Sequence, residues 1–224
     1  MGVALRSGVV ARLDDPSGDA EDRELQDIDA LVVRMFALVS EGLVAATEAF
    51  LACDRERARE VVAADREIDA LQQSLEDLVE RRLVQDHRFA PHDVRLLISV
   101  LRIAPELERS GDLIELIALR TPQGLPARLP ARARGLLAEM GRLASVMWCA
   151  AADAYIDRDA EAADRLRAYD DVIDDLHYEL TDELTRSGAS IAVAIEMGLV
   201  ARFYERLGDH AVNVARRVGY LTNG

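Results

Sequence analysis

The second half of the chain repeats the first, and this repeat restricts the fold more than any other feature of the sequence. Residues 51–71 match residues 156–176 at a constant offset of 105 positions, and residues 106–120 match residues 203–217 at an offset of 97. Two segments that recur in the same order indicate two copies of one supersecondary unit. The repeat aligns acidic residues in four places: Asp65 with Asp170, Asp69 with Asp174, Glu108 with Glu205, and Asp112 with Asp209.

Each copy of the repeat has the composition and the apolar spacing of helices. Ala, Leu, Arg and Glu are abundant and only 4% of the 224 residues are aromatic, which favours helices over β-sandwiches and barrels. Short connections between helices favour antiparallel neighbours, so the sequence predicts an all-α fold of two tandem, sequence-related three-helix bundles. Apolar residues recur at helical spacing in six segments: 24–52, 55–86, one that begins at Pro91, 131–156, 159–186 and 190–221.

A break near the middle of the chain separates the two predicted bundles. Pro122, Gly124 and Pro126, with Pro130 just beyond, end one helix and cannot lie inside the next. The N-terminal residues have no long apolar core and no signal-peptide cleavage pattern. The predicted organisation is a flexible N-terminal extension over 1–22, a first bundle over 23–121, a linker over 122–130 and a second bundle over 131–224.

The charge and the cysteine content argue against several classes of protein. The formal net charge of −14 disfavours nucleic-acid binding, which needs Lys and Arg to replace counterions on phosphates, and attachment to an anionic membrane surface. Cys53 and Cys149 are too few for a disulfide framework or a zinc site. No stretch approaches the roughly 18 uninterrupted apolar residues of a membrane span, so we expect a protein of the reducing cytoplasm.

The repeat places four acidic pairs at one spacing on its helices. Residues i and i+4 are neighbours on one helix face, where two like charges cost roughly 0.2–0.5 kcal/mol unless something compensates. In each half one pair lies on the second helix and the other on the third, so four carboxylates converge if those faces meet. Such an oxygen-rich site suits hard cations, and the candidate metal ligands are Asp65, Asp69, Glu108, Asp112, Asp170, Asp174, Glu205 and Asp209.

Alternatives to metal binding stay open for these pairs. With 41 acidic residues in the chain, any single pair can arise by accident on a solvated face. Arg202 could also satisfy Glu205 in place of a metal. Gly111 and Gly208 lie inside predicted helices, where glycine costs about 1 kcal/mol against alanine. They indicate a close helix approach, either around a shared site or in packing without a ligand.

The last segment of the chain resembles the C-terminal signature of the PhoU family. The run FYERLGDHAVNVARR at 203–217 carries the resemblance, and ERSGD at 108–112 is a weaker partner motif. The runs DREID at 65–69 and DDVID at 170–174 look like the family's other acidic motif. The resemblance covers nearly everything from about residue 24 to residue 222.

Membership of this family implies two tandem three-helix bundles. It implies that the paired carboxylates hold divalent or trivalent metal ions, with iron, manganese, magnesium or zinc as candidates, and that His210 and Asn213 are possible supporting groups behind them. It also implies a negative regulator of phosphate uptake and phosphate-starvation signalling. Such a protein docks to cytoplasmic components of the Pst phosphate ABC transporter and to a PhoR-type sensor histidine kinase. It is cytoplasmic, at most peripheral at the inner face of the membrane through these partners, and a homodimer is a possible assembly.

Two residues of the first half depart from the family pattern. Leu116 stands where Asn213 stands in the second motif. Pro105 is expected to kink the helix that carries Glu108, because proline removes a backbone hydrogen bond inside a helix. The second-half site is therefore expected to be the better formed of the two.

Two other functions are consistent with an acidic helical bundle. A metal-free helical adaptor shares the fold and differs only in metal content. A ferritin-like di-iron oxidase would be an enzyme, but that class uses Glu-x-x-His motifs, and the nearest approach in this chain is Asp174-x-x-His177. The sequence also contains no P-loop and no nucleophile constellation, so we expect a protein that is not an enzyme.

Overall fold

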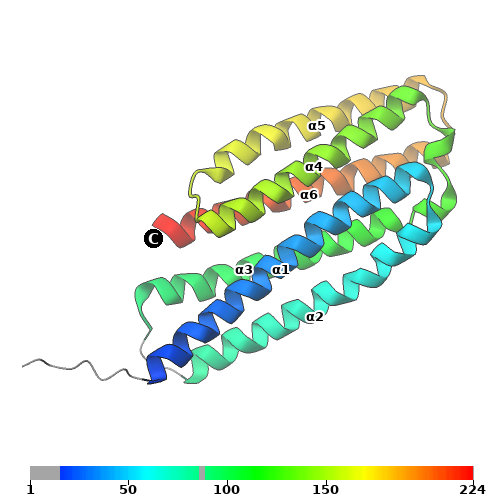
Figure 1. Ribbon diagram of the computed structural model, residues 1–224. Helices are drawn as coiled ribbons and strands as arrows, with labels where there is room; N and C mark the ends of the chain where they lie inside the picture. The colour runs from blue at the N-terminus through cyan, green and yellow to red at the C-terminus, as the bar shows by residue number, and fades with distance from the viewer. Residues whose placement is uncertain (1–15, 86–88, 224) are drawn as a thin grey trace, which may run out of the picture.

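The computed structural model describes residues 16–85 and 89–223 (Figure 1). The regular elements in these residues are all helices, which confirms the predicted all-α fold and the order of its six long segments. They are α1 (Pro16–Ala52), α2 (Arg55–Gln85), α3 (Pro91–Ala118), the short 3-10 helices η1 (Thr121–Gln123) and η2 (Pro126–Arg128), α4 (Ala131–Asp157), α5 (Ala162–Arg186) and α6 (Ile191–Asn223).

Helix α1 begins at Pro16, inside the stretch 1–22 that was predicted to be a flexible extension. Proline is well tolerated in the first turn of a helix, because the backbone N–H that it lacks has no partner inside the helix there. The first helix therefore starts earlier than the sequence predicted, and residues 1–15 lie outside the described part of the chain.

Each half turns from its first helix into its second in the same way. Cys53 and Arg158 adopt left-handed backbone conformations, with φ of 57° and 55°, and these end α1 and α4. The following residues are Asp54, which directly precedes α2, and Asp159, which lies three residues before the start of α5. Each accepts the backbone N–H of the residue two positions on, at 3.0 and 2.9 Å. The repeat offset of 105 positions therefore holds in three dimensions through both corners.

The six helices form two three-helix bundles that share one core. Helices α1–α3 pack on one another in the first half and α4–α6 in the second, while α1 packs against α4 and α3 against α6. Helices α2 and α5 lie at opposite outer edges of the molecule (Figure 1). The buried apolar side chains form a single cluster that runs through both halves, so the two bundles are packed into one unit.

Side chains from the two halves meet in the centre of this unit. Trp148 of α4 is fully buried, and its ring centroid lies 6.2 Å from that of Phe36 on α1. The Tyr204 hydroxyl on α6 donates a hydrogen bond of 3.1 Å to Oγ1 of Thr47 on α1. Gly141 allows α4 to approach α1 closely, because a Cβ at this position would lie 2.5 Å from Cγ2 of Thr47. These contacts hold α1 of the first half closely against α4 and α6 of the second.

Helix α3 continues through Pro105 without interruption. Proline removes the hydrogen bond to the carbonyl four residues earlier, which belongs to Leu101. That residue is exposed, and the helix nevertheless runs on to Ala118. The helix that carries Glu108 and Asp112 is therefore complete despite the proline.

Helix α1 is strongly apolar, and within the described residues it is the one helix that could cross a membrane by length and composition, over Arg23–Ala52. Core helices of soluble proteins pass the same test. The apolar residues of α1 line the shared core, where many are fully buried: Ile28, Val32, Met35, Val39, Leu43, Ala46, Ala49 and Phe50. Burial inside the bundle accounts for this composition.

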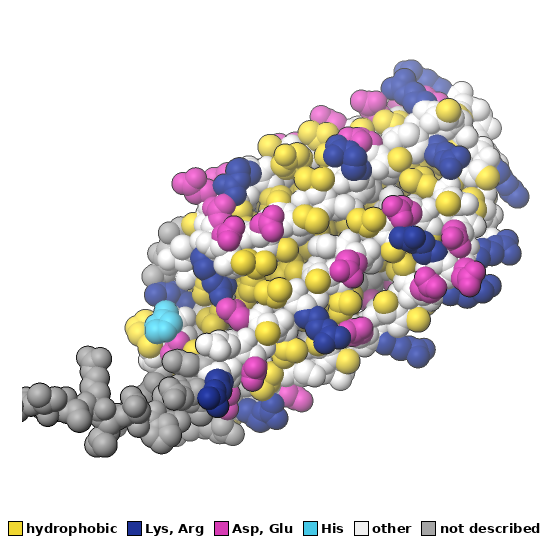
Figure 2. Space-filling view, in the orientation of Figure 1, with side chains coloured by type: hydrophobic (Ala, Val, Ile, Leu, Met, Phe, Trp, Pro, Cys, Tyr) yellow, Lys and Arg dark blue, Asp and Glu magenta, His cyan; other side chains and the backbone are white. Residues whose placement is uncertain are grey.

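Figure 2 shows one face of the molecule, on which acidic and basic side chains are interspersed. Apolar side chains also reach this surface (Figure 2). On α1 and α4, Val33, Val44 and Val146 are each more than a third exposed. The face over α1 and α4 is therefore mixed in character, whereas the acidic pairs lie on α2, α3, α5 and α6.

Candidate functional site

In the first half, the structure brings the predicted carboxylates of α2 and α3 together. Burial, followed by the charge of Asp69 and then by carboxylates on α3, raises the pKa of Asp65 to about 6. Burial also raises the pKa of Glu108, and Asp112 and Asp69 add to that rise. The carboxylates of α2 and α3 therefore lie within range of one another's charge. We call this group the first carboxylate cluster: Asp65, Asp69, Glu108, Asp112 and Glu115.

The second half has the corresponding arrangement on α5 and α6. Burial, followed by the charges of Asp209 and Asp174, raises the pKa of Asp170 to about 6, and Arg216 offsets part of the rise. Burial and then Asp209 raise the pKa of Asp174 as well. We call this group the second carboxylate cluster: Asp170, Asp171, Asp174 and Asp209.

A glycine lies beneath the central aspartate of each cluster. A Cβ on Gly111 would lie 2.8 Å from Oδ1 of Asp65 and 3.0 Å from Cδ1 of Ile68. A Cβ on Gly208 would lie 2.5 Å from Oδ1 of Asp170. Contacts this short do not occur between a real Cβ and a carboxylate oxygen, so each glycine makes room for a carboxylate. The close helix approach expected from the sequence is therefore an approach around the acidic groups.

One oxygen of the second cluster is buried and has no hydrogen-bond partner among the described residues. This atom is Oδ1 of Asp170, the oxygen that lies over Gly208. Burying a polar atom without a partner costs free energy, and a buried charge costs more. A cation bound at this oxygen would remove that cost.

The donor set of both clusters suits a hard cation, because it consists of carboxylate oxygens. In the described part of the chain, however, no three His, Cys, Asp or Glu side chains are arranged so that they could already hold a metal ion. The chemistry of the residues therefore fits a metal. Their side-chain conformations would have to adjust to bind one.

Glu205 has partners of its own, which separates it from the other predicted ligands. Arg202 forms an ion pair with one carboxylate oxygen, and Nδ1 of His177 lies 2.7 Å from the other. Burial, followed by the charge of Arg202, lowers the pKa of His177, while Asp174 opposes that shift. The sequence raised Arg202 as the alternative partner of Glu205, and the structure places it there, with His177 as a second partner.

His210 faces α3 and not the second carboxylate cluster, and its Nε2 lies 3.9 Å from Oε2 of Glu106. Its Nδ1 lies 2.9 Å from Oγ of Ser110 on α3, in the interface between the halves. The Ser110 hydroxyl donates to the backbone carbonyl of Glu106 at 2.7 Å, so it accepts from the Nδ1–H of His210. Burial, followed by the charge of Arg206, lowers the pKa of His210 to about 4. His210 is therefore a neutral interface residue that faces the other half.

Asn213 is linked to the second cluster through Arg216. Its Oδ1 accepts a hydrogen bond of 3.2 Å from the Arg216 guanidinium, whose charge acts on Asp170. The sequence interpretation missed Arg216 and also Asp171 and Glu115. Glu115 follows Asp112 by three positions on the same helix, so helical spacing alone could have identified it.

Comparison with known proteins identifies relatives over most of the chain. A family model described as the PhoU domain matches residues 32–121 and 137–218, one copy in each half. The chain is 31% identical over 210 residues to the phosphate-specific transport system accessory protein PhoU homolog 2 of Mycobacterium tuberculosis, covering 92% of this chain and 97% of that protein. It is 29% identical over 209 residues to PhoU homolog 1 of Thermotoga maritima, covering 91% and 89%.

Two crystal structures share the fold. PhoU from Pseudomonas aeruginosa matches with a TM-score of 0.83 and 27% identity, over 91% of this chain and 99% of that one. The phosphate transport system regulatory protein PhoU from Streptococcus pneumoniae matches with a TM-score of 0.77 and 26% identity, over 90% and 96%. The duplicated helical unit, the matched family model and these relatives agree, and the chain belongs to the PhoU family.

Proposed function

We propose that this protein is a negative regulator of phosphate uptake and phosphate-starvation signalling. It acts without catalysis, by docking to cytoplasmic components of the Pst phosphate transporter and to a PhoR-type sensor kinase. The names of its relatives, which are accessory or regulatory proteins of phosphate transport, support this role. The protein works in the cytoplasm and reaches the inner face of the membrane through its partners.

The observation that carries the metal part of the proposal is the buried, unpartnered Oδ1 of Asp170 over Gly208. In the second half, Asp170, Asp174 and Asp209 would hold the ion. Glu205 would join them only after exchanging Arg202 and His177 for the metal. In the first half, the ligands would be Asp65, Asp69, Glu108 and Asp112.

When bound, a divalent or trivalent cation supplies positive charge to an otherwise acidic surface. The protein's own residues hold the carboxylates of neighbouring helices in place: the glycines let α2 approach α3 and α5 approach α6. Neutralising either cluster removes repulsion between those helices. Metal binding therefore stabilises the packing of α2 on α3 and of α5 on α6, and it alters the charge that a docking partner meets.

The metal site is tested by metal analysis of protein purified without chelator. Wild type should hold metal in stoichiometric amounts after incubation with iron or manganese, and the double variant Asp170→Ala/Asp209→Ala should lose the share bound by the second half. A matched control, Glu179→Ala/Asp182→Ala, removes two exposed carboxylates from α5 and should retain all of the metal. No metal in wild type, or equal metal in all three proteins, would contradict the site.

The docking role is tested separately by crosslinked pull-down from phosphate-replete cells, followed by mass spectrometry. Transporter or sensor-kinase components should be captured by wild type in excess over an unrelated helical protein of similar charge. Capture of neither component would overturn the regulatory proposal even if the metal sites were established.

A further inference from the structure

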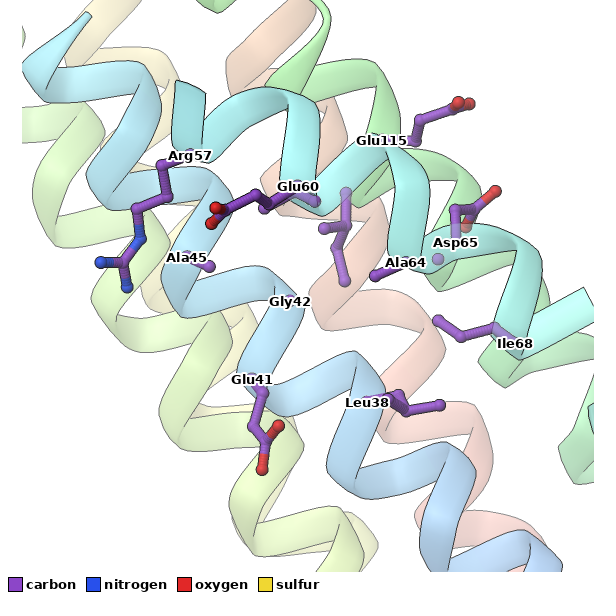
Figure 3. Close-up of a pocket in the computed structure, with 13 residues that line it drawn as sticks. Leu38, Glu41, Gly42, Ala45, Arg57, Glu60, Ala64, Asp65, Ile68 and Glu115 are labelled. Atoms are coloured by element: carbon purple, nitrogen blue, oxygen red, sulfur yellow. The ribbon is translucent and has the colours of Figure 1, made fainter. Parts of the chain in front are cut away.

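A cavity of about 260 Å³ lies in the first bundle, between α1 and α2 and over α3. Its volume exceeds the roughly 150 Å³ that accommodates a benzene molecule inside a protein. Figure 3 shows its apolar side chains, with Leu38, Gly42 and Ala45 on α1 and Ala64 and Ile68 on α2. The cavity is therefore large enough for a ligand of about ten non-hydrogen atoms.

Small residues create this space, and the second half has large residues at the same repeat positions. At the offset of 105, Gly42 corresponds to Met147 and Ala64 to Tyr169. Met147 is fully buried, and its Cε lies 3.5 Å from the position of a Cβ on Gly208. In the second half, the side chain of Met147 thus fills the space that is open beside Gly42 in the first half.

Carboxylates surround the cavity, and most of them are also specific to the first half. Those that line it are Glu41, Glu60, Asp65 and Glu115. At the two repeat offsets the corresponding residues of the second half are Val146, Arg165, Asp170 and Val212, so only one of the four is acidic. The open volume of the cavity and its negative charge are therefore both found in the first half and not at the equivalent positions of the second half.

The one basic residue that lines the cavity is already paired. Arg57 contacts Glu48 at 2.9 Å, and Glu48 is not part of the lining. Among the described residues, the Glu41, Glu60 and Glu115 side chains form no ion pair with Lys, Arg or His. A ligand that carries positive charge would meet these carboxylates without displacing a protein cation.

The acidic residues lie in two groups in the lining. In Figure 3, Glu41 and Glu60 lie on the side of α2 that faces α1, and Asp65 and Glu115 lie on the side that faces α3. The charge of Glu115 contributes to the raised pKa of Asp65. A ligand with one charged end would satisfy one side only, and a ligand with amines at both ends and methylene groups between them would satisfy both.

We propose that this cavity binds a small organic polycation, an aliphatic di- or polyamine, whose methylene chain packs on the floor of Gly42, Val61 and Ile114 and whose ammonium groups pair with the carboxylates on either side. Burial of the methylene groups favours binding, and charge-assisted hydrogen bonds to the carboxylates add to this. The site is separate from the proposed phosphate regulation and does not depend on metal, although it shares Asp65 and Glu115 with the first carboxylate cluster.

Calorimetric titration of spermidine into chelator-treated full-length protein at low ionic strength tests the proposal. Wild type should bind spermidine saturably at one site, and at least about tenfold more tightly than 1,8-octanediol, which has a similar length without charge. Non-saturating heats, or equal binding of the two probes, would overturn the proposal.

Two variants copy the second half into the first. Gly42→Met/Ala64→Tyr fills the cavity with its repeat counterparts, and Glu60→Arg introduces the counterpart Arg165. Each should weaken spermidine binding by about tenfold or more. Asp182→Arg, the same change of charge at an exposed site on α5, should bind like wild type. Equal weakening in Asp182→Arg and Glu60→Arg would show general attraction to an acidic protein and overturn the site.

The same variants separate this site from the metal sites. Glu60→Arg and Gly42→Met/Ala64→Tyr leave all eight candidate metal ligands unchanged, so metal content should stay at the wild-type level while spermidine binding falls. Because Glu60 is exposed, Glu60→Arg should fold even if the double variant does not. Spermidine binding by Glu60→Arg at wild-type affinity would overturn the proposal.

Discussion

Asp170 lies directly over Gly208, with Oδ1 2.5 Å from the position that a Cβ on the glycine would take. The same relationship joins Asp65 to Gly111 at 2.8 Å in the other half. Glycine inside a helix costs about 1 kcal/mol relative to alanine. Both halves carry that cost. In each half, the glycine allows a carboxylate on the neighbouring helix to approach closely.

Gly208→Ala should destabilise the protein although alanine is the better helix former. The added methyl group would overlap Asp170 and force α5 away from α6, and overpacking of this kind costs about 1–3 kcal/mol. The free energy of unfolding, measured in urea, should therefore fall by a net amount of up to about 2 kcal/mol.

Gly198→Ala is the matched control for this change, because it lies on the same helix and a Cβ there meets nothing within 4 Å. It should leave the stability unchanged or raise it by up to about 1 kcal/mol. Adding Asp170→Ala to Gly208→Ala should recover most of the loss. Similar effects of the two glycine substitutions would contradict a close contact at Gly208.

The metal-free protein should gain stability from Asp170 as the pH falls. Burial, with the charges of Asp209 and Asp174, raises the pKa of Asp170 from 3.8 to about 6. The folded state therefore holds a proton that the unfolded state releases between these values. This contribution is fully present below about pH 4 and is lost as the pH rises through about 6.

Asp170→Asn removes the ionisation and should stabilise the protein relative to wild type more at about pH 7.5 than at about pH 4.5. Urea unfolding of the two chelator-treated proteins at both pH values measures this difference. Excess Mn²⁺ at the higher pH should reduce the stability difference between the two proteins, because it stabilises wild type alone. If the difference in unfolding free energy between Asp170→Asn and wild type were the same at both pH values, ionisation of Asp170 would not destabilise the folded state.

His210 should act in the opposite direction. Burial, followed by the charge of Arg206, lowers its pKa from 6.5 to about 4, so the unfolded state takes up a proton first. Its contribution to stability is present above about pH 6.5 and is lost as the pH falls through about 4. NMR titration should show the His210 imidazole neutral well below pH 6.

Replacing both partners of this contact separates packing from titration. The repeat counterparts of Ser110 and His210 are Leu207 and Leu113, both buried. Ser110→Ala alone should cost about 1 kcal/mol because it leaves the buried imidazole N–H unpaired. Ser110→Leu/His210→Leu should be closer to neutral and should remove the loss of stability between about pH 6.5 and pH 4. The same pH dependence in the double variant would assign it to another group.

The repeat allowed much of the fold and the clusters to be predicted from the sequence. Helical spacing places Asp65 and Asp69 on one face of α2, and the offset of 105 transfers that face to Asp170 and Asp174. A repeat reports what each copy has in common, so the resemblance between the halves was sufficient to predict carboxylates converging between the second and third helices.

Contacts that break the repeat could not be predicted in this way. His210 follows Asp209 by one residue on α6, and one residue turns a helix by about 100°. The Asp209 side chain therefore faces α5, whereas the His210 side chain faces the first half. Which helix of that half it meets depends on the packing of α3 against α6. The partners of Glu205 also come from two helices, and only Arg202 lies within one helical turn of it in the sequence.

The two halves should unfold together, because the shared core leaves neither half complete. Phe36 and Thr47 of α1 contact Trp148 and Tyr204 across the interface. Full-length protein should therefore show a single calorimetric transition, with equal calorimetric and van't Hoff enthalpies. Residues 1–121 expressed alone should be helical but should melt without a cooperative transition and bind a hydrophobic dye.

Gly141→Ala crowds Thr47 at the interface. It should lower the temperature of the single transition of the full-length protein without splitting it, since a loss of about 1–3 kcal/mol at the interface acts on both halves. Two separate transitions, or a sharply melting first half, would show that the halves are independent domains.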